Sequence, residues 1–244
     1  MDLSKRVKKP EIKKSGQNEQ NNTLKKETLT LIDPSSEGGS TAFLVGGSMS
    51  GKTTLIVQSL LNILKDPLLR DRYNIIIIFS ESLAAIPLQD LPIRKDLKIQ
   101  IFPVYIPELV KLAQKINFKT NNRYGFYFIL DDCNELRGGQ VRKQILQLRN
   151  LGISTLISTQ YCKNIGPAPR ASFHHIYITG ARTTGDREAL VDLFLNPYMR
   201  DMGILSREDK DDYIRRHTHL EDHQRGLLHI NTTKDSLTSH IIKK

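Results

Sequence analysis

The hydrophobic positions of this sequence fall mainly into short continuous runs. Residues 74–80 and 124–130 are apolar at nearly every position, which is typical of strands buried on both faces of a parallel sheet. Further runs predict strands at residues 41–45, 97–102, 153–159, 173–179 and 226–230. The pattern predicts an α/β fold whose central sheet is mostly parallel.

Segments with helical spacing lie between these runs. We expect a helix over residues 52–65 that ends before Pro67, because the residue before a proline is pushed out of the α region. Residues 106–118 predict another helix, with Leu109, Leu112 and Ile116 on its apolar face. The remaining expectations are a short edge strand at 29–32, an irregular stretch at 81–97, helices at 140–150 and 186–195, and a charged helix at 206–216.

A glycine-rich segment joins the first predicted strand to the first predicted helix. It has the pattern G-x-x-x-x-G-K-[ST] and comprises Gly46, Gly47, Ser48, Met49, Ser50, Gly51, Lys52, Thr53 and Thr54. Glycines allow a tight turn, and the amino end of the helix adds positive dipole, so the main chain can hold a polyphosphate. The sequence therefore predicts an ATP site in which Lys52 reaches the β- and γ-phosphates and Thr53 binds Mg²⁺. An ordinary glycine-rich turn is the alternative.

Two carboxylates follow the buried run at 124–130. Asp131 and Asp132 are expected at the carboxyl edge of the sheet, where the glycine-rich loop also opens. This is a Walker B pattern, in which Asp131 would hold Mg²⁺ and Asp132 would orient or deprotonate the attacking water. Glu135 is an alternative base, and an acidic turn without a catalytic role is the structural alternative.

Gln160 follows the next predicted strand, at 153–159. An amide at this strand end could contact both the γ-phosphate and the attacking water, which makes Gln160 a candidate sensor. An ordinary polar residue at a strand end is the alternative. Asp131 lies 79 residues after Lys52, with two predicted strands between them. This spacing leaves room for a strand inserted between the strands that end in these two motifs.

Composition limits the class of protein. Lys and Arg total 36 and Asp and Glu total 26, a net charge of +10, which suits a polyanionic partner but also a solvated basic surface. We expect residues 1–27 to be a disordered basic tail that binds nucleic acid, directs nuclear import or only aids solubility. No run reaches the roughly 20 apolar residues of a membrane span, and Cys133 and Cys162 are expected to be reduced. We therefore expect a soluble intracellular protein, with an ATPase domain at 28–235 and a short tail at 236–244.

Three histidines, His217, His219 and His223, have the spacing H-x-H-x₃-H. A zinc site is one interpretation. A solvated histidine-rich loop is the favoured one, because no cysteine lies nearby and acidic residues intervene.

The segment from Arg149 to Gln160, RNLGISTLISTQ, resembles the R-x-x-G-I-x…(S/T)-Q segment of the FtsK/HerA superfamily of DNA-pumping ATPases. Within it, the chain is most similar to genome-packaging ATPases of poxviruses, other large double-stranded DNA viruses and related virophage- or transposon-like elements. The residues Leu130 to Cys133 and the pair Pro169 and Arg170 agree with this resemblance, which covers roughly residues 40 to 232.

The resemblance implies a RecA-like, additional-strand P-loop NTPase that hydrolyses ATP with Mg²⁺. It implies a pentameric or hexameric ring that drives double-stranded DNA through a pore into a preformed capsid, docked on a capsid or portal-like protein. Arg149 would reach the neighbouring subunit's site, with Arg170 as second choice. We expect Arg149 at the end of the helix before the strand at 153–159, near the sheet edge where the phosphates bind. Arg137, Arg142 and Lys143 are candidates for the pore. The protein would act at the site of virion assembly in host cytoplasm or nucleus, or travel with the virion.

Other functions fit parts of the pattern. Another FtsK/HerA motor, for conjugation or plasmid partition, is the first alternative. A small-molecule nucleotide kinase would need an arginine-bearing lid, and residues 81–97 carry only Arg94. A nucleotide switch that does not hydrolyse is disfavoured by the paired carboxylates.

Overall fold

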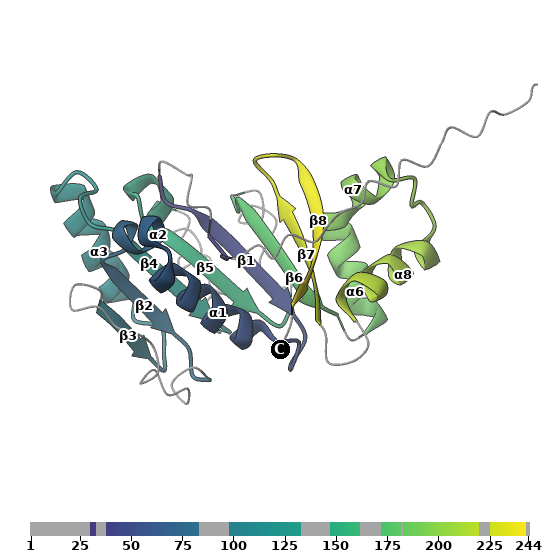
Figure 1. Cartoon of the computed structure of the whole chain (residues 1–244), viewed down its shortest axis with the longest axis horizontal. Coiled ribbons are helices and arrows are strands. Elements are labelled where there is room, and N and C mark those ends of the chain that lie inside the picture. The colour runs from purple at the N-terminus through teal and green to yellow at the C-terminus, as the bar shows by residue number, and fades with distance from the viewer. Residues whose placement is uncertain are drawn as a thin grey trace, which may run out of the picture.

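The protein is built on one sheet of eight strands. A computed structural model describes residues 30–32, 38–82, 98–132, 147–161, 172–181, 183–219 and 225–242 (Figure 1). The strands are β1 (Thr41–Gly46), β2 (Ile75–Phe79), β3 (Lys98–Phe102), β4 (Phe126–Asp131), β5 (Ser154–Thr159), β6 (His175–Gly180), β7 (Arg225–Asn231) and β8 (Ser236–Ile242). Their order is β3-β2-β4-β5-β1-β6-β7-β8, parallel up to β6 and antiparallel for the last two pairs. The predicted α/β fold with a mostly parallel sheet is confirmed.

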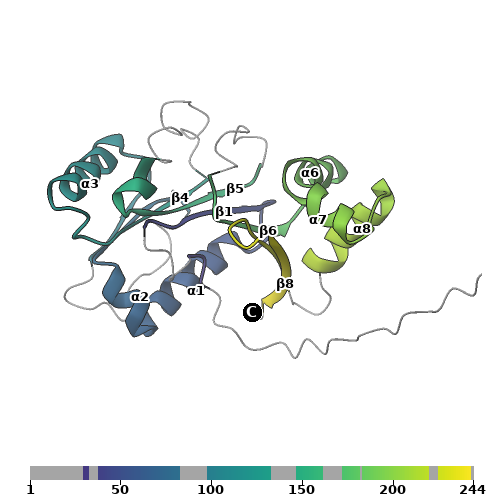
Figure 2. The same ribbon diagram turned by 90° about the horizontal axis from the view of Figure 1, so that it is seen from above.

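Two helices cover one face of the sheet (Figure 2). They are α1 (Lys52–Lys65) and α2 (Pro67–Arg72). Leu55, Ile56, Leu60 and Ile63 of α1 pack against alternate strand residues such as Leu44. The first helix has the predicted bounds. The short α2 was not predicted: Pro67 takes the first helical position, where no N–H is needed, and the Asp66 side chain accepts from the Leu68 N–H over 2.9 Å.

The other helices pack on the opposite face. They are α3 (Pro107–Lys119), the 3₁₀ turn η4 (Arg149–Leu151), α6 (Thr184–Leu190), the π-helical turn η6 (Val191–Leu195), α7 (Asn196–Asp201) and α8 (Arg207–Thr218). In α3 the buried side chains are Val110, Ala113 and Asn117, whereas Leu112 is 53% exposed. The predicted inward position of Leu112 is therefore wrong, and the buried face lies one residue further along the helix.

The strand between β1 and β4 is β5, so the expectation of an inserted strand is confirmed. The inserted strand follows Asp131 in the chain, however. The two strands between Lys52 and Asp131, β2 and β3, lie on the far side of β4. Because β5 is central, the residue that follows it lies between the ends of β1 and β4.

Two local expectations were wrong. Residues 30–32 form no strand; instead Leu31 and Ile32 are buried, and the Leu31 N–H donates to the Ser59 hydroxyl of α1. Residues 236–244 are not merely a tail, because Ser236–Ile242 pairs along the whole of β7 as β8.

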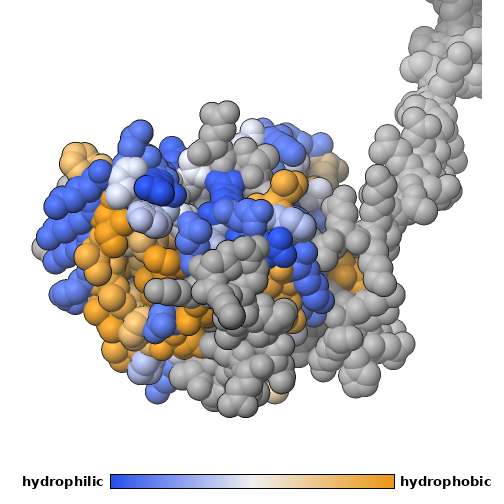
Figure 3. All heavy atoms as spheres, turned by 60° about the vertical axis from the view of Figure 1, so that its left-hand side comes forward, coloured by the Kyte–Doolittle hydropathy of each residue, from blue (hydrophilic) through white to orange (hydrophobic). Residues whose placement is uncertain are grey.

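The surface at the opposite end of the sheet, around β3 and α3, faces the viewer in Figure 3. Hydrophobic and hydrophilic areas lie side by side on it.

Candidate nucleotide site

The glycine-rich loop joins the end of β1 to the start of α1. Gly51 has φ 94°, a left-handed conformation that glycine adopts without strain, and it immediately precedes the first residue of α1. Met49, also in the loop, has φ 61° and is 79% exposed. The turn therefore brings the amino end of α1 to the carboxyl edge of the parallel sheet, the arrangement that suits a phosphate group.

Contacts with β6 hold this loop in place. The Gly47 N–H donates to the Gly180 carbonyl over 3.0 Å, and the hydroxyls of Ser50 and Thr179 lie 2.8 Å apart. A Cβ on Gly46 would collide with these same two hydroxyl groups. Glycine at position 46 is thus required by the close approach of the loop to β6.

Lys52, the first residue of α1, has a side chain that is only 6% exposed. Its Nζ donates to the Gly46 carbonyl over 2.8 Å and lies 3.9 Å from Oδ2 of Asp132. Burial lowers the pKa of Lys52, while the charges of Asp132 and Asp131 oppose that shift. The cation is therefore near the carboxylates that end β4.

Asp131 is the last residue of β4, and its side chain is buried. Its Oδ2 accepts from the hydroxyls of Ser80 over 2.9 Å and Ser82 over 3.1 Å. The sequence prediction missed both serines, although Ser80 directly follows β2 and so lies at the same edge of the sheet. The carboxylate of Asp131 and the hydroxyl of Thr53 are hard oxygen donors, so this donor set fits Mg²⁺.

Asp132 adopts φ 51°, which is uncommon for a residue other than glycine, and its N–H donates to the Ser158 carbonyl of β5. Gln160 follows the end of β5 and donates from Nε2 to Oδ2 of Asp132 over 3.1 Å. The Asp132 side chain is 37% exposed, so water has access to it. Lys52, Asp131, Asp132 and Gln160 thus converge at one edge of the sheet, at or just beyond the carboxyl ends of the adjacent strands β4, β5 and β1.

Arg149 lies elsewhere. It precedes β5, and its carbonyl accepts from the N–H of Gly39, which precedes β1. It therefore lies at the amino edge of the parallel strands, about 20 Å from Gln160 given six strand residues at about 3.3 Å each. We expected Arg149 near the edge where phosphates bind, and that placement is wrong, because a residue before a parallel strand lies at the opposite edge from a residue after it.

Several predicted residues lie outside the described part of the chain: Cys133, Glu135, Arg137, Arg142, Lys143, Cys162, Arg170, His223 and the tail at 1–27. Of the zinc candidates that are described, His217 stacks on Tyr213 with ring centroids 4.1 Å apart, and His219 lies 3.0 Å from the Thr218 hydroxyl. Among the described residues, no three His, Cys, Asp or Glu side chains form a metal-binding group. No helix within those ranges is long and apolar enough to span a bilayer.

Comparison with known proteins gives fold similarity at low sequence identity. The DNA-packaging ATPase B204 of Sulfolobus turreted icosahedral virus aligns with a TM-score of 0.57 at 13% identity, covering 82% of this chain and 96% of that one. The genome-packaging NTPase B204 of Sulfolobus turreted icosahedral virus 2, in complex with ATPγS, aligns with a TM-score of 0.54 at 16% identity, covering 86% and 98%. No family profile and no curated protein matches the sequence. The chain thus has the fold of P-loop ATPases of this type.

Proposed function

We propose that this protein is a Mg²⁺-dependent ATPase that translocates double-stranded DNA and packages a viral genome into a preformed capsid. The observation that carries the proposal is the contact between Gln160 and Asp132, 3.9 Å from the Lys52 ammonium group. A carboxylate and an amide that meet beside the lysine of the phosphate loop suit the positioning of a water molecule for attack on the γ-phosphate.

Each residue has a distinct part in the proposed reaction. Lys52 binds the β- and γ-phosphates and offsets their charge, and Asp132 orients the attacking water and accepts its proton. Gln160 holds the Asp132 carboxylate and senses the γ-phosphate. Thr53 and Asp131 would hold Mg²⁺, which supplies charge stabilisation to the phosphates when bound. Ser80 and Ser82 fix the orientation of Asp131.

The net charge of the chain and its similarity to solved structures support the proposal that it translocates and packages DNA. The net charge of +10 suits a protein that binds phosphate backbones irrespective of base sequence. The two B204 structures are of a genome-packaging NTPase and a DNA-packaging ATPase, and the alignments with this chain cover 98% and 96% of their length. A homo-oligomeric ring docked on a capsid or portal-like protein is part of this proposal, as is action at the site of virion assembly.

The test is an ATPase assay of the full chain with and without duplex DNA at low and high salt. We expect stimulation by duplexes of unrelated sequence and loss of that stimulation as salt rises, because the contacts are with phosphates. The matched control is Lys52→Ala, which removes the phosphate-binding cation. Hydrolysis unaffected by DNA, or stimulated by one sequence only, contradicts the translocase. Phosphate transfer to an added nucleoside monophosphate indicates a kinase instead.

A further inference from the structure

A pocket of about 680 Å³ lies between the amino end of α6 and the carboxyl end of α8. We call it the α6–α8 pocket. It is lined by Thr183, Thr184, Arg187, Arg215, Arg216 and His219. Its volume is within the usual range for small-molecule sites. Neither the metal-binding residues nor the catalytic pair belongs to it.

The pocket adjoins the phosphate loop through Gly180. The Gly180 carbonyl accepts from the Gly47 N–H of the loop. A Cβ placed on Gly180 would lie 3.6 Å from Cε1 of His219 and 3.9 Å from Cβ of Ser50. His219 and the phosphate loop are therefore neighbours across one glycine.

The strand order gives the direction of a bound nucleotide. The γ-phosphate end must face Asp132 and Gln160, which follow β4 and β5 on one side of β1. The phosphate chain then runs across the loop at the end of β1, and its other end points away from β5. On that side lies β6, followed by the α6–α8 pocket.

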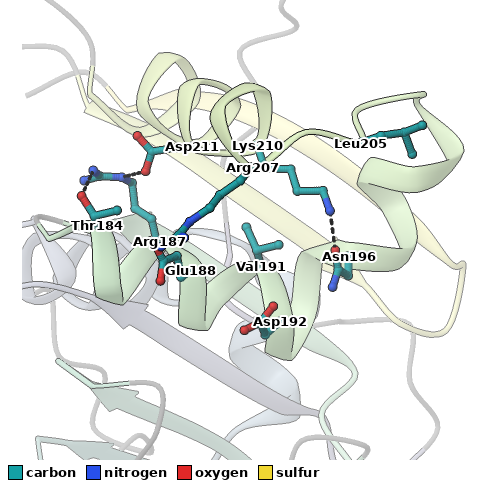
Figure 4. Close-up of a pocket in the computed structure, with 10 residues that line it drawn as sticks. All are labelled: Thr184, Arg187, Glu188, Val191, Asp192, Asn196, Leu205, Arg207, Lys210 and Asp211. Atoms are coloured by element: carbon teal, nitrogen blue, oxygen red, sulfur yellow. Dashed lines mark hydrogen bonds and ion pairs between the residues drawn. The ribbon is translucent and has the colours of Figure 1, made fainter.

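The lining of the pocket suits a base and a sugar close to phosphates. Of its six described lining residues, three are arginines and none is acidic. Arg187 is 4% exposed and is fixed by its ion pair with Asp211 and by its bonds to the Ala181 carbonyl and the Thr184 hydroxyl; Figure 4 shows its contacts with Asp211 and Thr184 in the adjoining pocket. Arg216 and His219, on the α8 side of the pocket, are exposed. Imidazole and guanidinium planes both stack on nucleobases.

We propose that the α6–α8 pocket binds the base and ribose of ATP, with the His219 ring stacked on the base. This inference rests on the proposed nucleotide site but not on DNA translocation. It assigns a role to one member of the histidine motif, and it makes the β6, α6 and α8 side of the molecule the part that distinguishes a nucleotide from a bare polyphosphate.

The test compares two ligands by titration calorimetry of the full chain: a non-hydrolysable ATP analogue and inorganic tripolyphosphate. His219→Ala should weaken binding of the analogue about 10-fold, within the range found for loss of a base-stacking side chain. Binding of tripolyphosphate should not change, because it occupies only the phosphate loop. His219→Phe keeps an aromatic plane and should retain most of the affinity. His217→Ala is the matched control, because it removes an imidazole from the same helix end outside the pocket.

Three results would overturn the proposal. The first is unchanged affinity of His219→Ala for the analogue, and the second is an equal loss for both ligands, which indicates damage to the loop. The third is weaker binding of duplex DNA by Arg216→Ala and His219→Ala with nucleotide affinity intact, which assigns the pocket to DNA phosphates. Failure of the nucleotide site itself has a different signature, since Lys52→Ala would then bind both ligands as the wild type does.

Discussion

Gln160 donates a hydrogen bond to the carboxylate of Asp132 over 3.1 Å, although the two residues are 28 positions apart in the chain. The contact exists because β5 is inserted between β1 and β4, so the residue after β5 meets the residue after β4. The pair is further fixed by the N–H of Asp132, which donates to the Ser158 carbonyl of β5. Any water attacking a phosphate held by Lys52 would therefore meet an oriented carboxylate.

Asp132→Asn should bind ATP with near wild-type affinity and hydrolyse it at least about 100-fold more slowly, because an amide cannot accept the proton of the attacking water. Asparagine tolerates the left-handed conformation found at this position, so the variant removes the charge without straining the backbone. The measurements are nucleotide affinity and single-turnover hydrolysis. Turnover at the wild-type rate would show that Asp132 is not the base, and Glu135 would be tested next.

Gln160→Ala should lower kcat by roughly 10-fold to 100-fold while the affinity for ATP is largely retained, because the amide positions Asp132 and the glycine-rich loop with Lys52 holds most of the phosphate charge. Steady-state kinetics separate the two parameters. If the main effect is a weaker affinity with kcat unchanged, Gln160 contributes to ground-state binding only.

Lys52→Ala should lose ATP binding by roughly 100-fold or more, since it removes a buried cation that the phosphates would otherwise meet. The matched control is Lys65→Ala, which removes an exposed lysine from the last turn of the same helix. Calorimetric titration with an ATP analogue measures both variants. Equal affinities for the two would place the nucleotide somewhere other than the glycine-rich loop.

The parts of the structure that sequence predicts well are those decided locally. A continuous apolar run specifies a buried strand, and the glycine-rich pattern specifies the turn before α1, whatever the rest of the chain does. β8 (Ser236–Ile242) was not predicted, because its residues are largely polar or exposed. Its pairing with β7 is what makes it a strand. Leu112 was placed wrongly because helical spacing gives a stripe but not which residues face the sheet.

The site residues show the same difference between features that are decided locally and features that depend on which strands lie side by side. The edge on which Asp131 and Gln160 lie follows from their position at the carboxyl ends of parallel strands. The same rule places Arg149 at the opposite edge, because it comes before β5. The contact of Asp131 with Ser80 depends on β2 lying beside β4, a neighbour relation that the chain order does not state.

The histidine cluster on β6, β7 and β8 should make stability fall in acid. The His229 ring stacks on Tyr177 at 4.4 Å, and its Nε2 lies 3.0 Å from Nδ1 of His175. Burial, together with the nearby charges of His175, His240 and Lys234, lowers the pKa of His229 to about 3. The unfolded chain then binds a proton below about pH 6.5 that the folded chain does not bind.

Stability from this group is therefore fully present above about pH 6.5 and falls as the pH drops towards 3, by about 1.4 kcal/mol per pH unit at most. Urea unfolding at pH 7 and pH 5 measures the change. His229→Phe keeps a ring beside Tyr177 but cannot titrate, so its loss of stability between these pH values should be smaller by about 2 kcal/mol. An identical loss in both proteins would show that His229 is protonated in the folded state.

Arg149 lies too far from the nucleotide site of its own subunit to act there. A role in the nucleotide site of a neighbouring subunit can be tested. Arg149 is exposed at the amino edge of the sheet, where its guanidinium lies 3.0 Å from Nε2 of His174. It is about 20 Å from the end of its own β5, further than its side chain can reach. We propose that it completes the site of the next subunit in a ring, where such a cation contributes roughly 10³-fold to 10⁵-fold in rate. A surface contact with His174 is the alternative.

Mixing two inactive variants separates these possibilities. Arg149→Ala subunits keep an intact phosphate loop, and Lys52→Ala subunits keep an intact arginine, so a mixed ring contains some sites with both groups. We expect the mixture to regain part of the ATPase activity that neither variant shows alone, with DNA present throughout. Arg123→Ala is the matched control, because it removes another exposed arginine that precedes a strand, β4, and it should hydrolyse ATP as the wild type does. Normal DNA-stimulated hydrolysis by Arg149→Ala alone, in an oligomer of wild-type size, would exclude Arg149 as the trans-acting residue and leave Arg170 as the candidate.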